Sequence, residues 1–154
     1  MHDIAERIAT IRDFVPRLRQ QIAGLSAEQL TTQYNAPEWT VAQNVHHLVD
    51  SHVNSYVRFK LILTEDQPTL RPYHQELFAE LGDAKEANIE DSLLILQGLH
   101  ARWSRMLENI TDWAKTGYHP EAQETYSLYD LLVIYSDHCH EHTQQIQEVL
   151  DKMP

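Results

Sequence analysis

Hydrophobic residues recur every three or four positions over four long segments of the chain, which is the period of an amphipathic helix. These segments span residues 4–22, 40–63, 88–110 and 127–152. The connections between them have unequal lengths, and those over 31–38 and 64–88 are long enough to cross a helical bundle. The pattern therefore predicts an all-α four-helix bundle with long crossover connections, formed by a single domain over residues 1–154.

Local signals indicate the ends of these helices and the shorter elements between them. Pro16 lies inside the first apolar pattern, where it is expected to kink or divide the helix, and Gly24 is expected to end it. Capping residues precede the later helices: Ser26 with Gln29, Thr40 with Gln43, Asn88, and Ser127 with Asp130. Residues 73–81 are expected to form a short helix, and residues 115–126 an extended excursion or a small hairpin.

The last helix has an anomaly on its apolar face, because two histidines stand where the pattern calls for leucine. The residues that share this face are Leu128, Leu131, Tyr135, His138, His142, Ile146 and Val149. His138 and His142 are four residues apart, so both imidazoles point the same way, as two ligands of one metal ion do. The alternative is a pair of core histidines bonded to tyrosines and backbone. Burying them without partners would cost about 1 to 3 kcal/mol each.

A third ligand is available on the second helix. One face of that helix carries His47, Asp50, Ser51, Asn54 and Arg58. His47 is the candidate for the third ligand, and the alternative is that this polar face is simply solvated.

Two further residues have open roles. His100, on the buried stripe of the third helix, is expected to be a core histidine, with a place near the metal as the alternative. Cys139 is expected to be a small core residue, with a role as a redox handle as the alternative.

Composition narrows the classes of function. The formal net charge is -11, from 23 acidic and 12 basic residues, and such a surface repels phosphate backbones, so nucleic-acid binding is disfavoured. Only four glycines are present, which disfavours a phosphate-cradling loop. The single cysteine forbids an intrachain disulfide, and no apolar run approaches the ~20 residues needed to cross a bilayer. With no signal-peptide pattern at its start, the chain is expected to be a cytoplasmic protein without a membrane partner.

The segment over residues 39–73, WTVAQNVHHLVDSHVNSYVRFKLILTEDQPTLRPY, resembles the signature of the YfiT-type proteins within the DinB-like superfamily. LHARW at 99–103, YHPE at 118–121 and HCHEHTQQI at 138–146 follow in the order of their counterparts there. The resemblance implies a four-helix bundle whose divalent metal, often nickel or zinc, is held by His47, His138 and His142. His46 is the alternative ligand in a shifted register. The resemblance also implies a homodimer.

The chain departs from the family's usual pattern around the last motif. Glu141 and Gln145 occupy positions that are commonly histidine, and Asp137 stands where an aromatic residue is frequent. These changes leave the three ligands in place and alter the pocket around them.

Three neutral imidazoles leave coordination positions of a divalent ion open, as in catalytic sites. Such an ion can lower the pKa of bound water to about 7, and with the resemblance this implies a hydrolase acting on a small ester, amide or similar bond. Asp50 is the candidate for the carboxylate that orients a ligand or moves protons.

Two alternatives to hydrolysis remain. One, which the resemblance suggests, is a bacillithiol-like S-transferase, in which the metal activates a low-molecular-weight thiol and Asn54 and Arg58 hold the cofactor or substrate. The other is a non-catalytic metal-binding stress protein.

Overall fold

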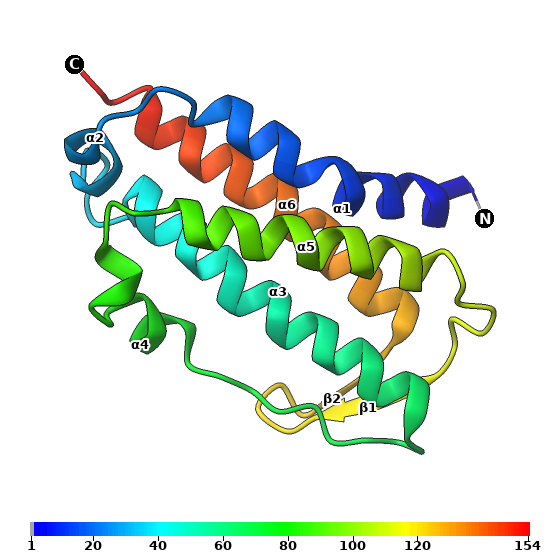
Figure 1. Cartoon of the computed structure of the whole chain (residues 1–154). Coiled ribbons are helices and arrows are strands. Elements are labelled where there is room, and N and C mark those ends of the chain that lie inside the picture. Colours follow the sequence, from blue (N-terminus) through cyan, green and yellow to red (C-terminus); the bar gives the residue numbers. More distant parts are fainter. Residues whose placement is uncertain (1) are drawn as a thin grey trace.

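The computed structural model describes residues 2–154, in which four long helices lie side by side in a bundle (Figure 1). The long helices are α1 (His2–Gln21), α3 (Val41–Thr64), α5 (Glu90–Leu107) and α6 (Leu128–Leu150). The shorter elements are α2 (Ala27–Thr31), α4 (Gln75–Ala79), the 3₁₀ helix η1 (Asp83–Lys85), β1 (Thr116–His119) and β2 (Glu124–Ser127). The predicted four-helix bundle is confirmed, and the segment expected to be extended forms an antiparallel hairpin.

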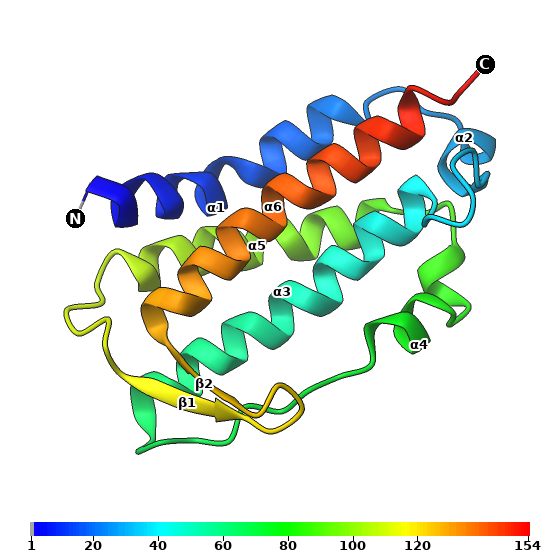
Figure 2. The same ribbon diagram turned by 180° about the vertical axis from the view of Figure 1, so that it is seen from behind.

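The helices do not follow a simple up-down-up-down order. Helices α1 and α6 run in one direction, and α3 and α5 run in the other (Figures 1 and 2). Both α1 and α3 pack against α5 and α6, so α1 and α3 face each other across the bundle. The connection over 65–89 carries the chain back along the whole bundle, as its length predicts, so α5 starts at the same end as α3 (Figure 2). This order makes α6 the antiparallel neighbour of α3.

Most of the predicted helix ends are confirmed. The capping boxes Ser26–Gln29, Thr40–Gln43 and Ser127–Asp130 all form, each with the side chain three residues on bonded back to the cap. Gly24 follows α1 with φ +79°, a left-handed conformation that favours glycine. Helix α1 continues through Pro16 as one element, so the expected division does not occur.

The predicted Asn88 cap is wrong. Ile89 takes the cap position of α5, with no side-chain hydrogen bond to the helix. The Asn88 amide instead donates to the exposed carboxylate of Asp91, while Ile89 packs against the hydrophobic core. The helix thus begins with a partly buried isoleucine packed on the core, while the predicted capping amide stays exposed.

One cluster of buried side chains runs through all four long helices, with Trp103, Phe59, Ile11 and Leu18 among its largest fully buried members. The hairpin and the segment after α3 close one side of it: Leu70 N–H donates to the Tyr118 carbonyl at 2.7 Å, and Tyr118 N–H donates to the Pro68 carbonyl at 2.9 Å. Among the described residues, no helix combines the length and apolarity needed to cross a membrane.

Candidate metal centre

Three histidines meet between α3 and α6. His47 comes from α3, and His138 and His142 come from consecutive turns of α6. One ring nitrogen of each lies within 4.8 Å of the others. The Nε2 atom of His138 is 3.4 Å from Nε2 of His47 and 3.1 Å from Nε2 of His142. The antiparallel packing of α3 and α6 thus brings together the three residues that the sequence predicts as metal ligands.

The orientation of His142 is fixed by Asn44, one turn before His47 on α3. Asn44 Oδ1 lies 2.8 Å from His142 Nδ1. The Asn44 amide nitrogen donates to the Thr40 carbonyl at 3.0 Å, so its oxygen is the atom turned toward the histidine. An amide oxygen can only accept, and this assigns the proton to Nδ1 of His142 and a free lone pair to Nε2.

His138 is held in the same way by other histidines. Its Nδ1 is 3.1 Å from Nε2 of His52, whose Nδ1 is 2.7 Å from Nε2 of His100. His100 Nδ1 in turn lies 2.6 Å from the backbone carbonyl oxygen of Ile11. Because that carbonyl can only accept, each ring carries its proton on Nδ1, and Nε2 of His138 is also a free lone pair.

A divalent cation fits this donor set. With both Nε2 atoms unprotonated, His138 and His142 direct lone pairs at each other across 3.1 Å, an arrangement that a shared cation stabilises. Two nitrogen ligands of a tetrahedral zinc ion lie about 3.3 Å apart, close to the separations of 3.1 and 3.4 Å found here.

Burial keeps all three rings neutral at pH 7. Desolvation lowers the pKa of His47 to about 3 and that of His138 to about 4. Desolvation, followed by the proximity of His138 and His47, lowers the pKa of His142 to about 2. Neutral imidazole is the form that binds metal, so the lone pairs are available over the physiological pH range.

The cluster opens into a pocket of about 440 Å³ at the end of the bundle where α3 begins. Trp39 covers one side, with its ring 4.7 Å from that of His47 and nearly parallel to that of His142. Four carboxylates line the pocket: Glu38, Glu76, Glu141 and Glu148. Among the described residues that line it, none is a lysine or an arginine, so the pocket walls are acidic.

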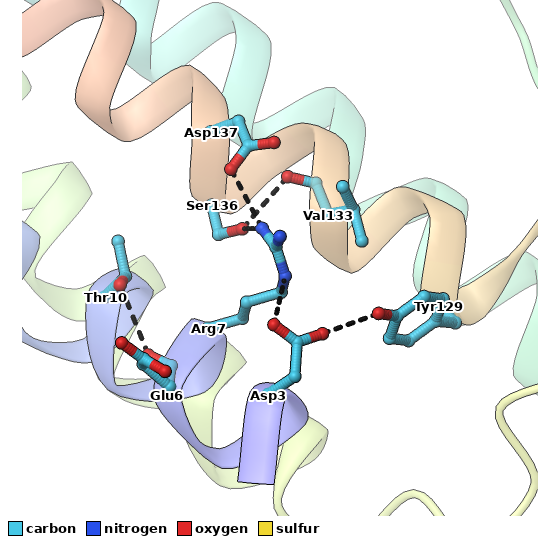
Figure 3. Close-up of polar contacts among 8 residues, drawn as sticks. All are labelled: Asp3, Glu6, Arg7, Thr10, Tyr129, Val133, Ser136 and Asp137. Atoms are coloured by element: carbon cyan, nitrogen blue, oxygen red, sulfur yellow. Dashed lines mark hydrogen bonds and ion pairs between the residues drawn. The ribbon is translucent and has the colours of Figure 1, made fainter. Parts of the chain in front are cut away.

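A polar network outside the pocket anchors α1 to α6 (Figure 3). The Arg7 guanidinium donates to Ser136 Oγ at 2.7 Å and to Asp137 Oδ1 at 2.8 Å, and also to Asp3. Tyr129 donates to the same Asp3. Asp137, the residue before His138, therefore forms an ion pair that ties this turn of α6 to α1.

The three predicted catalytic and substrate-binding residues lie along α3, outside the lining of the histidine pocket. Asp50 is half-buried, and desolvation, aided by Asp83, raises the pKa of its carboxyl group while His46 opposes the shift. Asn54 donates to the backbone carbonyl of Asp50. The roles assigned to Asp50 and Asn54 stay predictions.

Arg58 lines a neighbouring pocket of about 390 Å³, which shares Gln75 and Glu76 with the histidine pocket. Its guanidinium is held there by the Tyr135 hydroxyl and the Arg71 carbonyl, each at 2.8 Å. The predicted substrate-binding role of Arg58 is likewise untested.

The two remaining candidate residues, His46 and Cys139, lie outside the histidine cluster. His46 bonds to Ser92 Oγ and to the Glu86 carbonyl, so the alternative ligand points out of the cluster. Cys139 belongs to the hydrophobic core, where burial raises the pKa of its thiol.

Sequence reasoning missed Asn44 and Trp39. The spacing of Asn44, three residues before His47 and so on nearly the same side of the helix, was a usable signal. Nothing in the local sequence pattern indicates that Trp39 belongs to the site.

The chain matches known proteins over nearly its whole length. Residues 11–146 match the DinB superfamily. The "Putative metal-dependent hydrolase YfiT" of Bacillus subtilis (strain 168) is 41% identical over 148 residues, covering 95% of this chain and 83% of the relative. A "Putative metal-dependent hydrolase" of Geobacillus thermodenitrificans (strain NG80-2) is 42% identical over 149 residues, covering 96% of this chain and 84% of the relative.

The fold has a solved counterpart. A structure of YfiT from Bacillus subtilis, described as "a probable metal-dependent hydrolase with an unusual four-helix bundle topology", matches with a TM-score of 0.95 and 39% identity. The match covers 99% of this chain and 89% of that one. Similarity in sequence and fold over this length shows that the chain is a YfiT-type member of the DinB superfamily.

Proposed function

We propose that this chain is a metal-dependent hydrolase that binds one divalent ion through Nε2 of His47, His138 and His142. The observation that carries the proposal is the 3.1 Å separation of Nε2 of His138 from Nε2 of His142, with His47 beside them and with the Nδ1 atom of each of these two rings bonded to another residue. Imidazole ligands suit zinc and nickel, which are the ions we expect. The relatives' description as metal-dependent hydrolases supports the same assignment.

A divalent ion held by three imidazoles supplies Lewis acidity, which activates water and polarises a carbonyl group. The chain's own residues provide the setting for that chemistry. Asn44 keeps the proton of His142 on Nδ1, away from the cluster, and Trp39 shields the rings of His47 and His142 from solvent. The carboxylates of the pocket wall are the groups available to orient a water molecule or a leaving group.

The charge of the pocket favours a neutral or cationic substrate. Its described lining includes four glutamates and no lysine or arginine, which disfavours anionic molecules. A volume of about 440 Å³ suits a small molecule with a single ester, amide or similar bond. An anionic thiol cofactor fits these walls less well, and Asn54 and Arg58, its expected contacts, are bonded to other groups outside the lining. We therefore favour hydrolysis over thiol transfer.

The test combines metal content with a substrate screen on untagged protein. We expect about one zinc or nickel ion per chain by mass spectrometry, lost in His47→Ala, His138→Ala and His142→Ala. His46→Ala is the matched control, because its ring lies one residue away and outside the cluster. Metal-dependent cleavage of neutral or cationic esters or amides, with slower cleavage of anionic analogues, would support the proposal.

Two results would overturn it. A wild-type protein that stays metal-free after incubation with zinc and nickel has no such centre. A metal-loaded protein that processes only thiol conjugates is a transferase.

A further inference from the structure

A line of three histidines begins at His138, in the cluster of candidate metal ligands, and runs through the core to α1. His138, His52 and His100 are joined by contacts of 3.1 and 2.7 Å, and the line ends 2.6 Å from the Ile11 carbonyl. The side chains of His52 and His100 are 0% and 1% exposed. They come from α3 and α5, so the line connects all four long helices.

The direction of these hydrogen bonds follows from their fixed end. The Ile11 carbonyl has no proton to give, so His100 donates from Nδ1 and accepts at Nε2. His52 then donates from Nδ1 to His100 and accepts at Nε2, and His138 donates from its own Nδ1. His52 and His100 each have one donor and one acceptor in use, so reversing any one bond of the line would leave two protons or two lone pairs facing each other.

We propose that His52 and His100 are positioning residues that lock His138 in the tautomer whose Nε2 is free for metal. The effect on metal binding rests on the proposed metal centre. The tautomer of His138 does not, because it is a property of the metal-free chain. A ring nitrogen that donates to an acceptor fixes the ring's orientation and makes the opposite nitrogen a stronger ligand. Asn44 serves His142 in this way, and the His52–His100 pair serves His138.

The line of histidines fixes a tautomer and does not conduct protons. A path needs an end that can take up or release a proton, whereas this one ends on a backbone carbonyl.

Helix α1 supplies more than the terminal carbonyl. Phe14, one turn after Ile11, stacks on His100 with ring centres 5.6 Å apart. On α5, Trp103 packs edge-on against His52 at 5.7 Å. The orientation of His138 thus depends on the docking of α1, even though the three candidate ligands found among the described side chains come from α3 and α6.

The decisive variants replace His52 by a residue without hydrogen-bonding groups and by one with both a donor and an acceptor. His52→Phe keeps an aromatic ring of similar size but leaves the His138 Nδ1–H without an acceptor. His52→Gln restores one acceptor and one donor. We expect His52→Phe to weaken zinc binding about 10- to 100-fold in competition titrations with a chromophoric chelator, and His52→Gln to recover most of that loss. Equal affinity in wild type and His52→Phe would overturn the inference, as would equally weak binding in both variants.

A second measurement reads the tautomers directly, by ¹H–¹⁵N NMR of the imidazoles in metal-free wild-type protein. We expect a proton on Nδ1, and none on Nε2, for each of His138, His52 and His100. A proton on Nε2 of any of them would overturn the inference. Since this reading needs neither metal nor a variant that folds, it separates failure of the lock from failure of the metal centre.

Discussion

Asn44 and His142 join the first turn of α3 to α6 through a hydrogen bond of 2.8 Å between Asn44 Oδ1 and His142 Nδ1. The bond directs Nε2 of His142 into the cluster. We expect Asn44→Ala to weaken zinc binding about 10- to 100-fold, because the ring loses the acceptor that fixes its tautomer. Isothermal titration with zinc would measure the change.

The matched control is Asn54→Ala, which removes an asparagine of the same helix whose amide bonds only to a backbone carbonyl. Its zinc affinity should equal that of the wild type. If Asn44→Ala also keeps wild-type affinity, Asn44 does not orient a ligand.

Stability of the metal-free protein should fall as the pH drops below about 6.5. The pKa values of His47, His138 and His100 are lowered to between about 3 and about 4, so these rings stay neutral in the folded chain while the unfolded chain binds protons near pH 6.5. Where the unfolded state binds more protons than the folded state, the free energy of unfolding falls as the pH is lowered. The fall is at most about 1.4 kcal/mol per pH unit for each such ring.

Urea unfolding at pH 7.5, 6.0 and 5.0 would measure this loss. The window lies above the ordinary pKa values of carboxyl groups, so histidines dominate it. His100→Gln should show a shallower pH dependence because it removes one of the titrating rings. A free energy of unfolding that stays constant from pH 7.5 to 5.0 would contradict the buried, neutral histidines.

The sequence predicts what depends on local pattern. Apolar periodicity and the capping boxes give the four helices, and the four-residue spacing puts His138 and His142 on one face. Contacts between helices are a different matter. His52 and His100 lie on the apolar stripes of α3 and α5, and the pattern along each helix does not indicate a contact between them. Only the packing of α3 against α5 shows that they bond to each other.

The candidate residues on α3 illustrate the same limit. Arg58 follows His47 by eleven residues, which is about 16 Å along a helix at 1.5 Å per residue. The pocket lies at the other end, where Trp39 and Asn44 reach the cluster. A shared helical face therefore does not give a shared pocket.

Arg7 should contribute modestly to stability through its contacts with Ser136 and Asp137 (Figure 3). Its side chain is 24% exposed and that of Asp137 is 52% exposed, so solvent screens the ion pair. We expect Arg7→Ala to lower the free energy of unfolding by about 1 kcal/mol or less, with a smaller effect in high salt. Arg12→Ala is the control, because Arg12 pairs with the adjacent Asp13 and bridges no helices. An equal decrease in the free energy of unfolding in both variants would argue against a stabilising contact of Arg7 between α1 and α6.

Two glycines should respond in opposite ways to alanine. A Cβ at Gly117 of β1 would lie 2.9 Å from Leu70 Cδ2 and 3.0 Å from Ile62 Cγ1. Leu70 is fully buried and Ile62 is 1% exposed, so neither can move aside easily. We expect Gly117→Ala to destabilise the fold by about 1 to 3 kcal/mol.

Gly98 lies in α5 at an exposed position, with nothing within 4 Å of an added Cβ. Gly98→Ala should therefore stabilise the chain by about 0.5 to 1 kcal/mol, since alanine loses less backbone entropy in a helix. Thermal and urea unfolding of the two variants, followed by circular dichroism, would measure both changes. If Gly117→Ala is as stable as the wild type, the hairpin does not pack against Leu70 and Ile62 as closely as described. The side of the core that the hairpin covers is then packed more loosely than the contacts between β1 and residues 68–70 indicate.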